Sequence, residues 1–269
     1  MASIDSFLTR LVSRRHWVQA AFLLVWLDPL ALRLHGVCAP VFHCYACPLA
    51  TFACPIGVLA QYAALHVVPF LALGVLITAG ALFGGFLCGW ACPFGFLQDV
   101  LARIPTPRFK LPYWLNYSRY AVLLALVLLV PLLYGVEHPL FICALCPAGA
   151  WEAVAPRLAQ QLAAAQPVNW PNGLKIVLAL LFLLAMIFTY RPWCRFCPLG
   201  AIFGLFNRFS ALFLKLNLRA CTSCQICAQS CDLALRPAHN PNDPNCIRCL
   251  ECTICPQHAL GPGTLLDRR

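Results

Sequence analysis

Eight cysteines near the end of the chain have the spacing that iron–sulfur clusters require. Two, two and three residues separate the first four, and two residues separate each neighbouring pair of the second four. A [4Fe–4S] cluster takes four thiolates, and in two-cluster sites the fourth comes from the other run. The spacing therefore predicts two clusters, one on Cys221, Cys224, Cys227 and Cys255 and one on Cys246, Cys249, Cys252 and Cys231.

This pattern resembles the paired cysteine runs of bacterial ferredoxins. Two zinc sites or a disulfide knot are the alternatives, although zinc usually takes paired Cys-x-x-Cys knuckles instead of runs of four. Asp232 stands where proline usually follows the fourth cysteine, and the second run closes one residue short. Which cysteine crosses to which cluster therefore stays open at this point.

A second cysteine motif, Cys-Pro-x-Gly, occurs four times, at Cys54, Cys92, Cys146 and Cys197. Proline is well tolerated at the first position of a helix, so each of these cysteines is expected at a helix N-cap. The helix dipole lowers the pKa of a thiol there, and the resulting thiolate suits a metal cluster or redox exchange. The alternative is that these cysteines are small buried apolar residues.

The elements that position these cysteines are predicted to lie in a membrane. The 269 residues are 61% apolar and 10% charged, with a mean hydropathy of +0.77, a composition typical of membrane proteins. The 18 cysteines do not indicate a secreted disulfide-rich domain, which would be small and polar. We expect no signal peptide, because residues 1–15 are polar and no small-residue cleavage site follows the first apolar run.

The predicted fold is an all-α polytopic membrane protein with four transmembrane helices and a C-terminal ferredoxin-like domain. The spans are expected at about 17–34, 67–86, 117–134 and 174–190, because a span needs ~20 apolar residues. Short surface helices are expected near 94–104, 151–165 and 201–216. Asp28 interrupts the first span and is either functional or at the outer interface.

The spans and cysteine motifs predict two tandem repeats, covering roughly 17–100 and 117–205. Repeats related by an axis along the membrane normal bring like ends together. An inner site would then contain Cys88, Cys92, Cys194 and Cys197, and could hold a further cluster, a zinc ion or two disulfides. An outer site would contain Cys44, Cys47, Cys143 and Cys146, with Cys38 and Cys54 as substitutes.

Positive residues predict the orientation. The net charge is +10, and the basic residues flank apolar spans, which indicates topology signals and no nucleic-acid surface. Twelve of them fall on the side of the N-terminus and three on the other, so both termini are expected in the cytoplasm of a bacterial inner-membrane protein. The expected domains are a cytoplasmic N-terminus (1–16), the transmembrane domain (17–217), the ferredoxin-like domain (218–262) and a tail (263–269).

Residues 65–260, with Cys-Gly-Trp-Ala-Cys-Pro at 88–93 and a second Cys-x-x-Cys-Pro at 194–198, resemble the NapH family of quinol-dehydrogenase-like membrane subunits. The membrane core of NosR and MauN look like relatives. The resemblance implies electron transfer between membrane quinol and a periplasmic redox protein, with Cys88, Cys92, Cys194 and Cys197 as the matching motif cysteines. The second motif here has two intervening residues where the family has three.

Three functions remain open. The first is an electron conduit between cytoplasmic clusters, a membrane quinone pool and a periplasmic redox protein or metalloenzyme, with another iron–sulfur subunit as a further partner. Inner and outer sites are expected ~30 Å apart, so a quinone or other cofactor would connect them, and His43, His66 and His138 could handle quinol protons. The second is a quinone-linked thiol–disulfide oxidoreductase, and the third is an electron-donating assembly factor for a periplasmic metalloenzyme.

Overall fold

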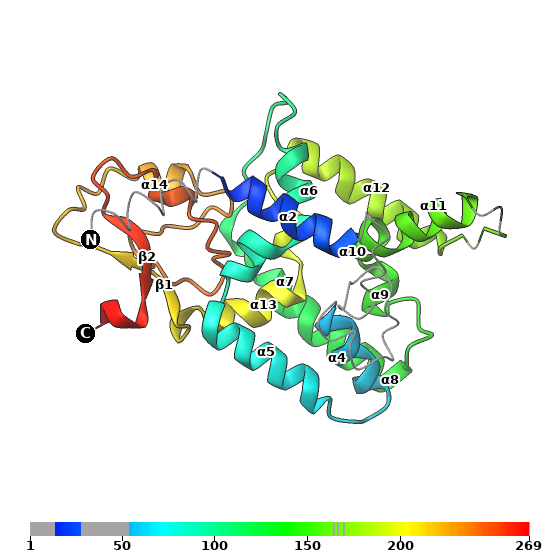
Figure 1. Cartoon of the computed structure of the whole chain (residues 1–269). Helices are drawn as coiled ribbons and strands as arrows, with labels where there is room; N and C mark the ends of the chain where they lie inside the picture. Colours follow the sequence, from blue (N-terminus) through cyan, green and yellow to red (C-terminus); the bar gives the residue numbers. More distant parts are fainter. Residues whose placement is uncertain (1–13, 28–53, 164, 166, 169, 269) are drawn as a thin grey trace.

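The structure, a computed structural model, describes residues 14–27, 54–163, 165, 167–168 and 170–268. The predictions for Asp28, Cys38, His43, Cys44 and Cys47 lie outside the described residues. A helical part and a loop-rich tail with two short strands lie at opposite ends of the molecule (Figure 1).

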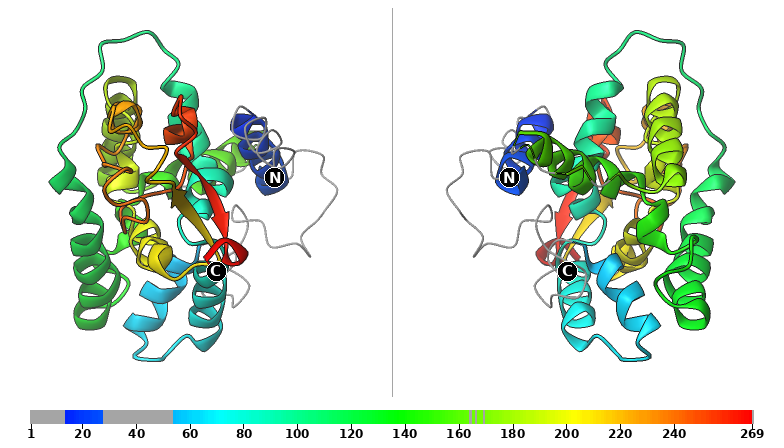
Figure 2. Two further views of the ribbon diagram at one scale, coloured as in Figure 1. Left: turned by 90° about the vertical axis from the view of Figure 1, so that its left-hand side faces the viewer. Right: turned by 90° about the vertical axis from the view of Figure 1, so that its right-hand side faces the viewer.

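The helical part contains, in chain order, α2 (Arg15–Leu27), α4 (Pro55–Ala64), α5 (Phe70–Phe83), η2 (Leu87–Ala91), α6 (Pro93–Leu101), η3 (Tyr113–Tyr117), α7 (Ser118–Val122), η4 (Leu123–Leu129), α8 (Val130–Tyr134), α9 (Ile142–Leu145), α10 (Pro147–Gly149), η5 (Ala150–Val154), α11 (Ala155–Ala163), α12 (Gly173–Phe188), η6 (Trp193–Arg195), α13 (Pro198–Leu205) and η7 (Phe206–Arg208). The tail contains β1 (Leu212–Leu216), α14 (Ile226–Gln229), η8 (Glu251–Ile254), β2 (Leu260–Thr264) and η9 (Leu265–Arg268). The linker from α6 to η3 passes over the outside of the helices (Figure 2).

The expectation of four transmembrane helices is wrong. Among the described helices, only the continuous segment Tyr113–Tyr134, with 22 residues and a mean hydropathy of 1.8, is long and apolar enough to cross a bilayer. The apolar helices α5 and α12 have 14 and 16 residues, about 21 and 24 Å at 1.5 Å per residue. Both are shorter than the ~30 Å hydrocarbon core.

Local sequence explains why these helices are short. Pro69 precedes α5, and Gly84 ends it in a left-handed conformation with φ of 53°. The Asn172 side chain accepts a hydrogen bond from Leu174 N and starts α12, which ends at the extended residue Thr189. The all-α expectation also fails in the tail, because β1 lies where a surface helix at 201–216 was expected.

The two cysteine-bearing halves share one order of elements. In each, an apolar helix (α5 or α12) leads to a tight turn with the first cysteine and then to a helix after Cys-Pro (α6 or α13). The turn with Cys88 is π-helical and the turn with Cys194 is a 3₁₀-helix. A π-turn contains more residues per turn than a 3₁₀-turn, so the wider winding accommodates the extra residue between Cys88 and Cys92.

Two paired strands enclose the tail. β1 and β2 are antiparallel, with Leu212 opposite Thr264 and Leu216 opposite Leu260. They lie side by side in both views of Figure 2. All eight tail cysteines lie between the two strands in the sequence, so the pairing closes the segment into one unit.

Three glycines of the helical part allow the tail backbone to approach closely. A Cβ atom added at Gly85, Gly89 or Gly204 would lie 2.5, 2.5 or 1.9 Å from the carbonyl oxygen of Cys246, Ile247 or Pro244, respectively. Real Cβ atoms do not approach this closely, so only glycine permits the contact. The loop 244–249 therefore packs directly on the helix backbones.

Candidate iron–sulfur centres

The two cysteine runs of the tail have left-handed residues at matching positions. The residues on either side of the middle cysteine of the first run, Ser223 and Gln225, have φ of 56° and 59°. Their counterparts around Cys249, Arg248 and Leu250, have φ of 50° and 65°. Left-handed residues turn the chain sharply, so both runs curl in the way that three thiolates around one cluster require.

One cavity in the tail is lined by all four cysteines expected for the second cluster. Cys231, Cys246, Cys249 and Cys252 lie in its wall together with Leu235 and Leu250. The residues present therefore fit a [4Fe–4S] cluster, because they place four thiols around one apolar space. Cys231 thus lies with the second run.

The first cluster site is less closed. Cys227 and Cys255 are buried, whereas Cys224 is exposed. Cys227 packs with Cys252 against Leu214, Leu250 and Leu260. The first run therefore lies next to the cavity of the second cluster. The grouping of Cys221, Cys224, Cys227 and Cys255 stays a prediction.

All four Cys-Pro motifs place the cysteine at a helix N-cap, as expected. Cys54, Cys92, Cys146 and Cys197 cap α4, α6, α10 and α13, each followed by proline in the first turn. The glycine of the motif donates its N–H to the thiol sulfur: Gly95 N to Cys92 Sγ at 3.4 Å, and Gly149 N to Cys146 Sγ at 3.5 Å.

Two of these capping thiols, Cys146 and Cys197, do not have the lowered pKa that the motif predicts, because burial raises the pKa of both. Burial raises the pKa of Cys197 to about 11, although N–H groups of Gly200 and Leu199 act to lower it. Burial also raises the pKa of Cys88, and the neighbouring Cys197 and Cys194 raise it further. Desolvation outweighs the helix terminus because these sulfurs lie inside the protein.

The predicted inner cysteines lie close together. Cys194 and Cys197 are near enough to Cys88 for their charges to affect its pKa. Cys92 and Cys197 pack against the same buried group, Phe94, Met186 and Trp193. Gln98 Nε2 donates to Cys194 Sγ at 3.4 Å, so α6 also orients the second motif.

Two buried arginines supply positive charge at this site. Arg119 and Arg191 are 0% and 1% exposed and lie within electrostatic range of Cys88 and Cys194. In the described part of the chain, Nη2 of Arg119 and Nη1 of Arg191 have no hydrogen-bond partner. Unpaired buried donors are costly, and an anionic cluster with acceptor sulfurs would satisfy them. The cysteines and arginines therefore fit an iron–sulfur group.

In the sequence these arginines count among the twelve basic residues on the side of the N-terminus, as topology signals, and the structure shows that they are also buried. Arg15, Arg119, Arg191 and Arg195 are all at most 3% exposed. The sequence does contain one sign of a role at the cysteine site, since Arg191 and Arg195 lie within three residues of Cys194. Their partners are distant in sequence, so the pattern alone did not identify them.

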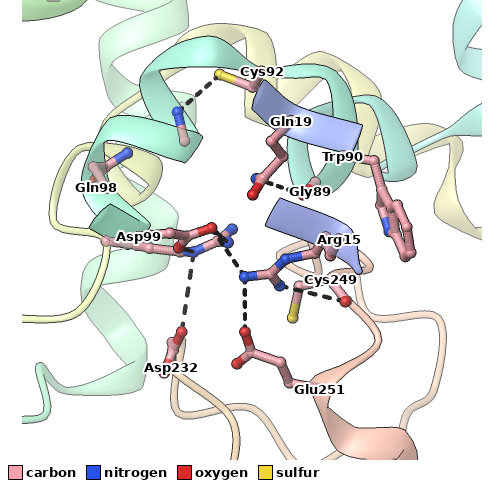
Figure 3. A network of polar contacts seen from close by, with 12 residues as sticks. Arg15, Gln19, Gly89, Trp90, Cys92, Gln98, Asp99, Asp232, Cys249 and Glu251 are labelled. Carbon is pink, nitrogen blue, oxygen red and sulfur yellow. Dashed lines mark hydrogen bonds and ion pairs between the residues drawn. The ribbon is translucent and has the colours of Figure 1, made fainter. Parts of the chain in front are cut away.

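Asp99 organises a buried ion-pair network between the helical part and the tail (Figure 3). Arg191 Nε and Nη2 donate to its two carboxylate oxygens at 2.8 and 2.5 Å, and Arg15 Nη2 donates at 2.9 Å. Arg15 also pairs with Glu251 of the tail at 2.9 Å. The network therefore joins α2, α6 and η8 beside Cys249, whose carbonyl accepts from Arg15 Nη1.

The outer cysteines that the structure describes, Cys143 and Cys146, are not a bilayer away from the inner ones. Cys146 packs with Cys92 and Cys197 on the Phe94–Met186–Trp193 group. Gly135, with φ of 75°, ends α8, and the following segment brings α9 against α12. This turn explains why the two sites are adjacent.

Single-ion metal sites and histidines contribute little to the candidate centres. Within the described ranges, no three Cys, His, Asp or Glu side chains are arranged to hold one metal ion. His66 is exposed in a loop, and His138 Nδ1 accepts a hydrogen bond from Leu140 N at 3.2 Å.

Comparison with known proteins relates the helical part to iron–sulfur proteins. Residues 65–112 and 172–217 match the family described as "4Fe-4S binding domain". These two segments contain Cys88 with Cys92 and Cys194 with Cys197, the motif cysteines of the two halves. No solved structure matches the chain.

Three relatives illustrate the similarity. The chain is 29% identical to the regulatory protein NosR of Stutzerimonas stutzeri over 63% of its length, 25% identical to the putative electron transport protein YccM of Escherichia coli over 72%, and 30% identical to the methylamine utilization ferredoxin-type protein MauN of Methylorubrum extorquens over 68%. The alignments cover 23%, 53% and 56% of these relatives, less than two thirds of each. Together the matches support iron–sulfur clusters and an electron-transfer role for this chain.

Proposed function

We propose that the protein transfers electrons at a bacterial inner membrane, between [4Fe–4S] clusters of the tail, a site on the inner cysteines, a quinone pool and a periplasmic redox partner. The clusters, when bound, supply one-electron redox chemistry. The protein residues hold them, exclude water and balance their charge.

One observation carries this proposal. Cys88 and Cys194 of the helical part and Cys231, Cys246 and Cys249 of the tail all pack around the buried residues Leu233, Leu235 and Ile247. The tail site and the inner site therefore share one apolar wall. Close approach favours electron transfer, and the glycine contacts at Gly85, Gly89 and Gly204 keep the two parts together.

The buried arginines support a redox role for the inner site. Hydrogen bonds to cluster sulfurs and nearby positive charge raise the potential of an iron–sulfur centre. Arg119 and Arg191 offer both at the inner site. Electrons from the more exposed tail would then move inward, towards the more positive potential.

Exposed apolar helices support the membrane location. Val177, Leu180 and Leu181 of α12 and Phe70 of α5 are all more than half exposed, as is Leu133 of the segment Tyr113–Tyr134. Large exposed apolar surfaces mark membrane or protein contacts. We place the tail and both termini on the cytoplasmic side, and a quinone would reach the apolar helices from the lipid.

The test uses the full chain, purified without oxygen in detergent. Two tail clusters account for about eight irons, and the wild-type protein should contain more than that. A quinol analogue should reduce its clusters. Cys92→Ser with Cys197→Ser should lose the iron and sulfide of one cluster, while the tail signals in electron paramagnetic resonance (EPR) remain. A folded protein without iron, whose cysteines form reducible disulfides, would contradict this function and favour thiol–disulfide exchange.

A further inference from the structure

A third group of cysteines lies in the helical part, beyond the inner cysteines as seen from the tail. Cys54 caps α4, Cys143 lies in α9 and Cys146 follows it. Cys54 is near enough to affect the electrostatics of both Cys143 and Cys146. The helix α9 packs against α4 and α12, which brings these three thiols together from two separate segments.

A buried lysine lies beside them. Lys175, in the first turn of α12, is 8% exposed, and its Nζ donates to the carbonyl oxygen of Cys143 at 3.0 Å. No carboxylate of the described residues forms an ion pair with it. A cation at a helix N-terminus is also unfavourable for the helix dipole. A buried, uncompensated ammonium needs an anion, so the environment of Lys175 points to a negatively charged occupant.

These thiols continue the series of sites described above. Cys146 shares the Phe94–Met186–Trp193 group with Cys92 and Cys197, and Cys197 is close enough to act electrostatically on Cys146. The order of neighbouring sites is therefore the tail cavity, the inner cysteines and this group. An electron could pass between neighbours along the whole series through protein alone.

We propose that Cys54, Cys143 and Cys146 hold a separate iron–sulfur cluster, the last redox centre of the series, whose negative charge Lys175 balances. Three thiolates leave one iron for another ligand. In the transfer step the inner site loses one electron and this site gains it. The added negative charge is stabilised by the Lys175 ammonium.

This inference rests on the proposed function, and its test separates the two. In full-length protein purified without oxygen, Cys143→Ser with Cys146→Ser should lose the iron, sulfide and EPR signal of one cluster. The tail and inner signals should persist in that variant, and they should respond to Cys92→Ser with Cys197→Ser instead. Unchanged iron and spectra in Cys143→Ser with Cys146→Ser would overturn the inference. Wild-type protein without any cluster in the helical part would overturn the proposed inner site as well.

A charge variant tests the site without removing a ligand. In a redox titration followed by EPR, Lys175→Met should lower the midpoint potential of one signal, because a positive charge that stabilises the reduced form is lost. Lys175→Arg should keep most of the wild-type potential. Lys215→Met is the matched control, since Lys215 is exposed and pairs with Asp267. A Lys175→Met protein with every potential unchanged would refute the role of Lys175 and the terminal site.

Discussion

Substitution of Gly204 by alanine should separate the tail from the helices. Gly204 lies in α13, and an added Cβ atom would be 1.9 Å from the carbonyl oxygen of Pro244 and 3.1 Å from its carbonyl carbon. An ordinary contact begins near 3.4 Å, so the loop must move by about 1.5 Å, the difference between 3.4 and 1.9 Å. Both atoms belong to backbone segments, so no side-chain rotation relieves the clash.

The expected energy follows from the clash alone. Overpacking costs about 1–3 kcal/mol, and this contact is close enough to reach the upper value. The greater helix propensity of alanine does not enter, because α13 is helical whether the tail is docked or separated. A loss of about 3 kcal/mol of docking free energy corresponds to a roughly 150-fold change in the equilibrium between docked and separated tail.

Amide hydrogen exchange of residues 244–252 in full-length protein measures this opening. Gly74→Ala is the matched control, because Gly74 is also helical and nothing lies within 4 Å of the added atom. Gly89→Ala should give a smaller effect, since its contact with Ile247 requires a movement of only about 0.9 Å, from 2.5 to 3.4 Å. Equal exchange in Gly204→Ala and Gly74→Ala would refute the close packing of the tail on α13.

Three further predictions concern the ion-pair network, the tail cavity and the orientation. Asp99→Asn should destabilise the protein by about 3–5 kcal/mol, because Arg15 and Arg191 lose their shared buried carboxylate; an unfolding midpoint in detergent equal to that of wild type would contradict this. Cys231→Ser should remove about four irons, because Cys231 lines the cavity with the second run; full retention of iron would place another ligand there. A reporter active only in the periplasm should be silent when fused after Arg269, and activity at that position would reverse the proposed orientation.

Local features of the fold could be predicted, whereas distant contacts could not. The N-cap position of Cys54, Cys92, Cys146 and Cys197 depends only on the proline that follows each cysteine, and the structure confirms it. Hydropathy overestimated the length of α5, because Pro69 and Gly84 bound the helix inside a longer apolar run. The raised pKa of Cys197 depends on burial by the assembled helices, which no local motif reports.

The grouping of sites shows the same division. The spacing of the tail cysteines predicted Cys231 with the second run, and these residues do line one cavity. The closeness of Cys146 to Cys197 depends on the return of the chain after Gly135. The burial of Arg191 could not be predicted for the same reason, since Arg191 and its partner Asp99 are 92 residues apart.

The contact between Arg15 and the tail has a consequence for biosynthesis. Arg15 donates to the carbonyl of Cys249, 234 residues later in the chain, so this contact can form only after residue 249 has been synthesised. Glu251, the tail carboxylate that pairs with Arg15, is made later still. During synthesis, helix α2 therefore lacks these two tail partners until the second cysteine run has been made.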